Sequence, residues 1–147
     1  MTDSPLDLIG FDTLLSDEER ATRDRVRAFV DAELRPNIAR WYDDGVFPRE
    51  IVEPMGALGL LGMHLQGYGC GGRSAVEYGL AAAELEAGDS GLRTFVSVQG
   101  SLAMTAIHTF GSEEQKNEWL PRMAAGTAIG CFGLTEPEAG SDPASMR

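Results

Sequence analysis

Cysteine is scarce in this chain of 147 residues, and the two that occur, Cys70 and Cys131, lie far apart. They form no C-x-x-C pair, so the sequence predicts neither a zinc site nor a disulfide framework. A reducing compartment is the simpler interpretation. Small metal-stabilised and disulfide-stabilised proteins are therefore not indicated.

Positive charge is also sparse. Lysine and arginine together number 12 against 23 acidic residues, which gives a formal net charge of −11. Phosphate backbones and anionic bilayers repel such a chain, so nonspecific binding to DNA, RNA or a membrane surface is not expected. An anionic ligand remains possible, because one arginine and the amino ends of helices hold phosphate or carboxylate locally.

The chain has no stretch with the composition of a membrane span. Residues 94–112 lack charged side chains, but six polar residues interrupt them: Ser97, Gln99, Ser101, Thr105, His108 and Thr109. These groups would be costly in hydrocarbon, so a helix buried in a soluble protein is predicted. The acidic start of the chain has no basic or apolar leader region. We expect a cytoplasmic protein, or one of the mitochondrial matrix if it is eukaryotic and processed.

Signals for the beginning of a helix are frequent. Ser16 precedes Glu19 and Ser74 precedes Glu77 at the spacing of a capping box, in which serine and glutamate satisfy each other's backbone N–H groups. Ser112 is a further amino-terminal cap. These serines predict helices that begin directly after them.

The predicted helices assemble into a bundle. Residues 1–15 show no strong period and are expected to form a loosely docked lead-in. Pro36 is expected to kink or end the first long helix. A helix over residues 92–110, capped by Asp89 or Ser90, carries no charge apart from Arg93 and is apolar on several faces. Such a helix is expected at the centre of the bundle.

The one β signal lies near the carboxyl end of the sequence. Residues 129–135 are predicted to form a strand, and residues 136–143 a loop rich in turn formers. A single strand has no partner to satisfy its backbone hydrogen bonds. The sequence therefore predicts a mainly α protein, with a helical domain over 1–127 and the start of a truncated β domain over 128–147.

The loop after this strand carries the clearest candidate binding residues. Thr135 and Ser141 have hydroxyl groups, and Gly140 lets the backbone turn without a Cβ clash. Together they offer several donors to a polar, partly anionic ligand. A plain β-turn with capping hydroxyls explains the same residues, and composition alone leaves both interpretations open.

Residues 133–142, G-L-T-E-P-E-A-G-S-D, resemble the signature segment of the acyl-CoA dehydrogenases, G-[LVM]-[ST]-E-x-x-x-G-[ST]-D. Residues 111–116 and 119–121 are similar to the helix pair that precedes this segment in the family, and the resemblance extends from about Leu14 onward. It implies an amino-terminal helical bundle, FAD as cofactor, an acyl-CoA substrate and electron-transfer flavoprotein as partner. It also implies a homotetramer when the protein is complete.

The resemblance assigns roles within the loop. Leu134 and Thr135 would meet the pyrimidine end of the isoalloxazine ring, and Ser141 would reach both the cofactor and the thioester ligand. Donors at this ring edge stabilise the negative charge that flavin reduction creates. The residues implied to line the FAD site are Phe132, Leu134, Thr135, Gly140 and Ser141.

Four further segments, residues 67–70, 78–80, 84–86 and 89–93, resemble the glutaryl-CoA dehydrogenase branch of that family. The branch implies that Arg93 binds the distal carboxylate of the substrate and that Glu86 supports Arg93. Thr94 stands where the branch carries serine, which keeps the hydroxyl and adds a methyl group. A structural Glu86–Arg93 pair that bridges the break between two helices is the alternative, because a buried guanidinium needs a carboxylate partner.

The family's catalytic base is a glutamate of a carboxy-terminal helical domain, and no residue of this sequence matches it. We therefore expect no catalytic residue in this chain, no carboxy-terminal domain, no metal and no dehydrogenase activity of the 147 residues alone. Two alternatives stay open. The complete protein could be another acyl-CoA dehydrogenase or oxidase of the same branch, or the chain could be a naturally short, non-catalytic helical binding module.

Overall fold

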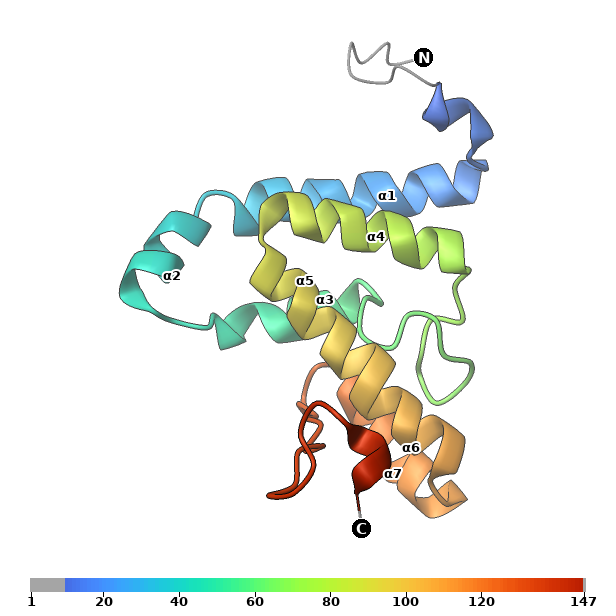
Figure 1. Ribbon diagram of the computed structural model, residues 1–147. Helices are drawn as coiled ribbons and strands as arrows, with labels where there is room; N and C mark the ends of the chain where they lie inside the picture. Colours follow the sequence, from blue (N-terminus) through green and yellow to red (C-terminus); the bar gives the residue numbers. More distant parts are fainter. Residues whose placement is uncertain (1–9, 147) are drawn as a thin grey trace.

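The computed structural model describes residues 10–146, which form a set of packed helices (Figure 1). The prediction of a mainly α chain is confirmed. The label η marks 3-10 and π segments. In chain order the elements are η1 Phe11–Leu14, α1 Asp17–Phe29, η2 Val30–Leu34, α2 Ile38–Asp44, η3 Arg49–Ile51, α3 Val52–Ala57, α4 Ala75–Gly88, α5 Ser90–Ser97, η4 Val98–Met104, α6 Thr105–Phe110, α7 Glu113–Ala124 and η5 Pro143–Ser145.

The predicted helix starts are confirmed. Ser16, Ser74 and Ser112 each cap a helix through a complete capping box, which pairs two backbone N–H groups that would otherwise lack partners. Of the two candidates for the start of α5, Asp89 forms the cap, because its carboxylate accepts a 2.7 Å hydrogen bond from the Leu92 N–H. Local sequence therefore sets where the main helices begin.

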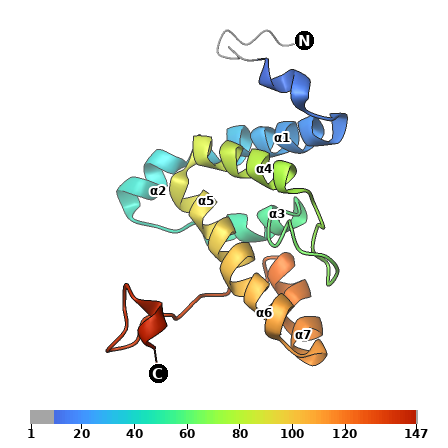
Figure 2. The same cartoon turned by 45° about the vertical axis from the view of Figure 1, so that its right-hand side comes forward.

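Helices α1 and α4 lie side by side and run in the same direction (Figures 1 and 2). The Thr22 hydroxyl donates to Glu77 Oε1 at 2.9 Å near the start of the pair. Further along, Arg27 donates to both carboxylate oxygens of Glu84, at 2.6 and 3.0 Å. The numbers of the paired residues rise together along both helices, so the pair is parallel. The connection between the two helices contains α2 and α3.

The buried apolar side chains form two clusters. The first joins α1, α2, α3, α4 and α5, and the second joins η4 to α7. Truncating a fully buried leucine in either cluster to alanine would cost about 2–5 kcal/mol. The first cluster contains Val26, Val30, Leu34, Trp41, Ile51, Val52, Met55, Leu60, Leu61, Met63, Ala81, Leu85, Leu92 and Val96. The second contains Leu65, Ala103, Met104, Leu120, Met123 and Ala124.

The helix predicted over 92–110, uncharged apart from Arg93, is α5, η4 and α6 in continuous succession. It contacts both clusters with one face, but Leu102 and Phe110 on the other side are exposed, Phe110 to 87%. The expected position at the centre of a bundle is therefore wrong for that side of the helix. The low charge of this helix therefore does not mean that the helix is completely buried. Part of its apolar surface is left uncovered by the described residues.

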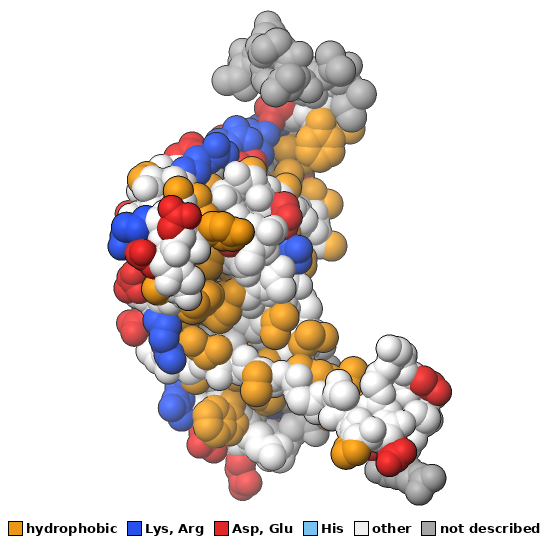
Figure 3. Space-filling view, turned by 60° about the vertical axis from the view of Figure 1, so that its left-hand side comes forward, with side chains coloured by type: hydrophobic (Ala, Val, Ile, Leu, Met, Phe, Trp, Pro, Cys, Tyr) orange, Lys and Arg blue, Asp and Glu red, His pale blue; other side chains and the backbone are white. Residues whose placement is uncertain are grey.

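The strand predicted over 129–135 is not formed. Within residues 10–146 the only β pairing is an isolated bridge between Glu136 and Ala139, which closes a tight turn. A strand needs a neighbour to satisfy its N–H and C=O groups, and none lies alongside this segment. Residues after Ala128 instead extend away from the packed helices as an extended tail (Figures 2 and 3). The packed helices, residues 10–128, are called the helical body.

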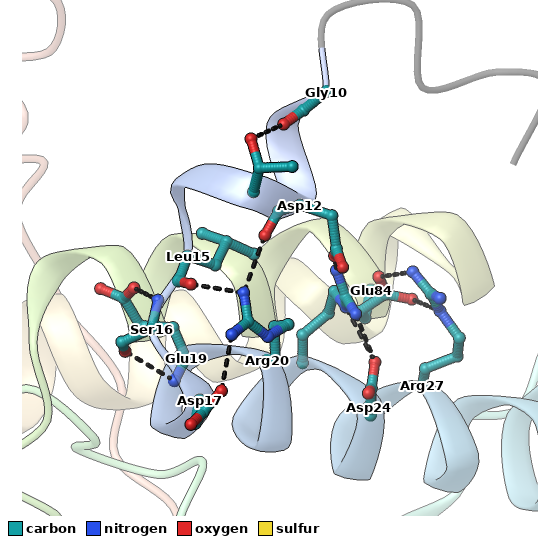
Figure 4. Close-up of polar contacts among 12 residues, drawn as sticks. Gly10, Asp12, Leu15, Ser16, Asp17, Glu19, Arg20, Asp24, Arg27 and Glu84 are labelled. Atoms are coloured by element: carbon teal, nitrogen blue, oxygen red, sulfur yellow. Dashed lines mark hydrogen bonds and ion pairs between the residues drawn. The ribbon is translucent and has the colours of Figure 1, made fainter. Parts of the chain in front are cut away.

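The lead-in before α1 is held more firmly than its sequence predicts (Figure 4). Arg20 donates to the carbonyl oxygens of Asp12 and Leu15, and Arg23 pairs with the Asp12 carboxylate. Residues 11–15 are therefore fixed by side chains of the helix that follows them. The rest of the predicted lead-in, residues 1–9, lies outside the described residues. The expected end of the first helix near Pro36 is confirmed, since the π segment η2 stops at Leu34.

Candidate functional site

The break between α4 and α5 brings Arg93 to Glu86. Glu86 lies in the last turn of α4 and Arg93 in the first turn of α5, and Arg93 Nε donates to Glu86 Oε2 at 2.6 Å. The side chains are 35% and 49% exposed, respectively. An ion pair this accessible contributes about 0–1 kcal/mol to stability, because water solvates and screens both charges. The pair therefore has little structural value and remains accessible to a ligand.

Arg93 also lines a small, mostly apolar cavity. A cavity of about 10 Å³ is lined by Arg93 together with apolar residues and Tyr78, whose hydroxyl lies 3.1 Å from Ser101 Oγ. Such a volume holds about one water molecule and no carboxylate group. A ligand for the Arg93 guanidinium must therefore approach from the exposed side. The apolar lining residues are Leu60, Met63, Ala81, Ala82, Leu85 and Val96.

Thr94 follows Arg93 on the exposed surface of α5. Its hydroxyl donates to the Ser90 carbonyl oxygen at 2.8 Å, a common contact of threonine within a helix. The hydroxyl is therefore turned back to its own helix. It must rotate about χ1 before it can donate to any ligand held by Arg93.

The five residues predicted to line a cofactor site all lie on the exposed tail. Among the described residues, residues 131–135 make no backbone-to-backbone hydrogen bond. Their N–H groups and the Thr135 and Ser141 hydroxyls are therefore available as donors. The structure gathers Arg93, Glu86 and Thr94 on one helix junction, and the described contacts include no hydrogen bond that joins this junction to the tail.

Sequence reasoning did not identify Gln99 as a structural anchor. This residue of η4 is only 1% exposed, and its amide bonds Met123, Ala128 and Gly130. The one available signal was a long polar side chain in the middle of an uncharged helix, since a buried amide requires partners. Its partners lie 24 to 31 residues away, and nothing in the local sequence names them.

The two histidines do not have the surroundings of a catalytic base. His64 Nε2 lies 3.2 Å from Thr105 Oγ1, and His108 Nε2 lies 2.9 Å from the Gln66 carbonyl oxygen. Burial, with a smaller contribution from His108, lowers the pKa of His64 and favours its neutral form. No carboxylate orients either ring among the described contacts, so both serve packing and local hydrogen bonding.

Two other kinds of site are not found in the part of the chain that the structure describes. Residues 10–146 contain no group of three or more histidine, cysteine, aspartate or glutamate side chains placed to hold a metal ion. None of the described helices combines the length and apolar character that crossing a membrane requires.

The helical body carries the decisive similarity. The family described as Acyl-CoA dehydrogenase, N-terminal domain, matches residues 16–127. The chain belongs to the acyl-CoA dehydrogenase family. The resemblance of the helices that precede the 133–142 loop is thereby confirmed. FAD is the cofactor of this family.

Individual acyl-CoA dehydrogenases support the same assignment. A crystal structure of a glutaryl-CoA dehydrogenase from Mycobacterium smegmatis, in complex with FADH2, superposes with a TM-score of 0.92 and is 62% identical over 97% of this chain and 37% of that chain. A Bacillus subtilis protein described as a probable acyl-CoA dehydrogenase is 39% identical over 87% of this chain and 34% of its own length. Human mitochondrial short-chain specific acyl-CoA dehydrogenase is 38% identical over 79% of this chain and 28% of its own length.

This member of the acyl-CoA dehydrogenase family spans about a third of the length of these relatives. The similarity to the glutaryl-CoA dehydrogenase structure extends beyond the helical body, since it covers 97% of the chain. The family match itself ends at residue 127, near the point where the extended tail begins.

Proposed function

We propose that this chain is the amino-terminal part of a glutaryl-CoA dehydrogenase. The reaction is the oxidation of the Cα–Cβ bond of glutaryl-CoA, followed by loss of the distal carboxylate as CO2 to give crotonyl-CoA. The observation that carries the proposal is the accessible Arg93 guanidinium, held by Glu86 at the start of an otherwise uncharged helix. The likeness to the Mycobacterium smegmatis enzyme supports it.

Arg93 has the chemistry to recognise a second carboxylate. Its described ion pair uses Nε, and a guanidinium has further N–H donors that match a carboxylate in a two-pronged contact. Glu86 fixes the plane of the group and offsets part of its charge. Because the cavity lined by Arg93 is too small for a carboxylate, the substrate carboxylate approaches from the exposed side of α5. A substrate without this carboxylate gains nothing from Arg93, which is the basis of selectivity.

The tail supplies groups that suit FAD. Thr135 and Ser141 are exposed hydroxyl donors, and Phe132 and Leu134 are exposed apolar side chains beside them. This combination fits an aromatic ring system whose edge accepts hydrogen bonds. Bound FAD supplies the acceptor for the hydride from substrate Cβ. In this proposal Thr135 and Ser141 orient the ring, and Ser141 also contacts the thioester.

The remaining parts of the proposal come from the family resemblance. The α proton is taken by a glutamate of a carboxy-terminal helical domain, electrons pass to electron-transfer flavoprotein, and the complete enzyme is a homotetramer. The cytoplasm is the proposed location, or the mitochondrial matrix in a eukaryote. The 147 residues alone are proposed to be inactive. Turnover of glutaryl-CoA by a preparation of verified mass would contradict that last point.

Replacing Arg93 by methionine in the complete enzyme tests the substrate assignment. Methionine keeps an unbranched apolar stem and removes the cation. We expect kcat/KM for glutaryl-CoA to fall by about 100-fold or more, and that for butyryl-CoA to change only a few fold, because only glutaryl-CoA loses a charged partner. Arg40→Met, at an exposed arginine bonded to Asn37, is the matched control. An equal loss with both thioesters would reject glutaryl-CoA and favour another dehydrogenase or an oxidase of the same branch.

A further inference from the structure

The buried amide of Gln99 lies where the extended tail leaves the helical body. Gln99 belongs to the π segment η4, and its side chain is buried together with the neighbouring Gly100. The wider turn of a π segment changes which side chains face the core. In this helix it accompanies two buried pairs of neighbours, Gln99 with Gly100 and Ala103 with Met104. A polar side chain thus lies in an otherwise apolar interface.

Three hydrogen bonds fix the Gln99 amide. Its Nε2 donates to the Met123 carbonyl at 3.1 Å and to the Ala128 carbonyl at 2.9 Å, while its Oε1 accepts from the Gly130 N–H at 2.8 Å. The reversed amide would place its oxygen against two carbonyl oxygens and its NH2 against an N–H group. Only one orientation is therefore compatible with the surroundings, and a carboxylate in the same place would be repelled.

Gly130 is seated closely against the same interface. A Cβ atom at this position would lie 2.6 Å from Ala103 Cβ and 2.6 Å from Met123 Cε. Such distances are far below a normal carbon–carbon contact, so only glycine allows this approach of the backbone. The Gln99 bond and the packing at Gly130 therefore hold one point of the chain from two directions.

Beyond Gly130 the described backbone no longer bonds to the helical body. The next described backbone-to-backbone hydrogen bonds, between Glu136 and Ala139, lie within the tail itself. Residue 133 is three residues further on, about 10 Å of extended chain at most. A small change of direction at Gly130 therefore displaces the start of the 133–142 loop by several ångströms, whereas a working binding site tolerates errors of about 0.5 Å.

We propose that Gln99 is a positioning residue that sets the direction in which the 133–142 loop leaves the helical body. The inference rests on the proposed function in one respect, namely that this loop contacts FAD. The hydrogen-bond partners of the Gln99 amide are all backbone groups of this chain. Gln99 acts through Ala128 and Gly130, so its loss leaves the binding groups in place and misdirects them.

The first test uses the 147-residue chain and needs no cofactor. Gln99→Met keeps the length of the side chain and removes its three bonds. We expect hydrogen exchange of the Gly130 amide to become about tenfold or more faster, while the amides of α1 and α4 keep their rates. Gln66→Met, which removes an exposed 3.3 Å contact to the Gly72 carbonyl, is the control and leaves Gly130 unchanged. An unaltered Gly130 exchange rate in Gln99→Met would overturn the inference.

If the methionine variant does not fold, Gln99→Asn takes its place. Asparagine keeps the amide but is one methylene shorter, so it cannot reach its partners on α7 and the tail together. The expected exchange behaviour of Gly130 is the same, and an unaltered rate again overturns the inference.

The second test measures FAD directly in the complete enzyme. We expect Gln99→Met to weaken FAD binding by about tenfold and to shift the visible absorption bands of the bound flavin. The reason is that the hydrogen-bond donors of the 133–142 loop are no longer aligned with the edge of the flavin ring. If the unaltered complete protein binds no FAD, the proposed function fails. If it binds FAD and Gln99→Met binds it with equal affinity and an identical spectrum, the proposed function stands and the role of Gln99 is rejected.

Discussion

The Thr22 hydroxyl on α1 donates a 2.9 Å hydrogen bond to Glu77 Oε1 in the first turn of α4, and both side chains are buried. The same carboxylate accepts the Ser74 N–H in the capping box and lies 3.3 Å from Arg73 Nη1. One glutamate thus begins a helix and also joins that helix to its parallel neighbour. Burial would raise the pKa of Glu77, but the hydrogen bonds from Ser74 and Thr22 and the charge of Arg73 together hold it below its usual value.

The pH dependence of stability follows from that lowered pKa. A carboxylate whose pKa is depressed in the folded state stabilises the protein at pH values above 4.5, the ordinary pKa of the group. This contribution is lost as the pH falls through the folded-state pKa. We expect Glu77→Gln to lower the free energy of unfolding by about 1 kcal/mol at pH 7 and by much less near pH 3. Urea unfolding followed by circular dichroism across this range measures the difference.

The exposed Glu50→Gln serves as the control for this experiment, because the side chain lies outside the buried interface and should give almost no difference at any pH. A gap between the unaltered chain and Glu77→Gln that stays constant from pH 7 to pH 3 would mean that ionisation of Glu77 does not stabilise the fold.

Gly126 marks a position where only glycine fits. Its φ of +81° lies in the left-handed region, and an added Cβ would lie 2.6 Å from the Val52 carbonyl oxygen. We expect Gly126→Ala to destabilise the chain by about 2–3 kcal/mol, since backbone strain and a clash add. Gly79→Ala, within α4 and with open space around it, should instead stabilise by about 0.5–1 kcal/mol. Thermal unfolding of both variants measures these changes. Melting temperatures that shift in the same direction would contradict the explanation that only Gly126 requires glycine.

Arg20 fixes the segment before α1 by donating to two carbonyl oxygens, those of Asp12 and Leu15 (Figure 4). Replacing it by leucine removes both donors and leaves the capping box at Ser16 intact. We expect the Leu15 amide to exchange about tenfold faster while the amides in the middle of α1 are unaffected. Arg25→Leu, at an arginine with one long contact of 3.4 Å, is the comparison. Equal exchange of Leu15 in all three proteins would show that the segment docks without Arg20.

Substitution of Glu86 tests whether the Glu86–Arg93 ion pair is structural or serves substrate binding. Because the Glu86–Arg93 pair is accessible, Glu86→Gln should change the unfolding free energy of the 147-residue chain by less than about 0.5 kcal/mol. In the proposed complete enzyme the same change should raise KM for glutaryl-CoA several fold, because Arg93 is less well oriented. A stability loss above about 1 kcal/mol with unchanged kinetics would make the pair structural.

The parts of the fold that sequence predicts well are those fixed over a few residues. A capping box needs a serine and a glutamate or glutamine at fixed spacing, so Ser16, Ser74 and Ser112 identify their helices directly. The proline that ends the first helix, Pro36, is an equally local signal. The Arg93–Glu86 contact, which spans a short helix break, is formed, and its role in substrate binding stays a prediction.

Features that depend on distant partners were not predicted. The 129–135 segment has the composition of a strand, but a strand forms only beside a neighbour. The bonds of Gln99 cross 24 to 31 residues and depend on a π segment that no local pattern indicates. The exposed side of the uncharged helix was taken as buried, because composition reports apolar character and not what covers it.

The π segment Val98–Met104 sets how α6 is rotated relative to α5 along this long helix. A π turn accommodates about one residue more than an α turn, and each residue of an α-helix advances the side-chain direction by about 100°. If this stretch formed a uniform α-helix with all its residues kept, the residue that the π turn accommodates would add about 100° to the side-chain direction. The portion from Thr105 onward would then rotate out of phase with Leu92 and Val96, so that one of the two apolar clusters loses its match. Both apolar clusters are therefore matched only because the extra residue of this stretch is taken up in a π turn.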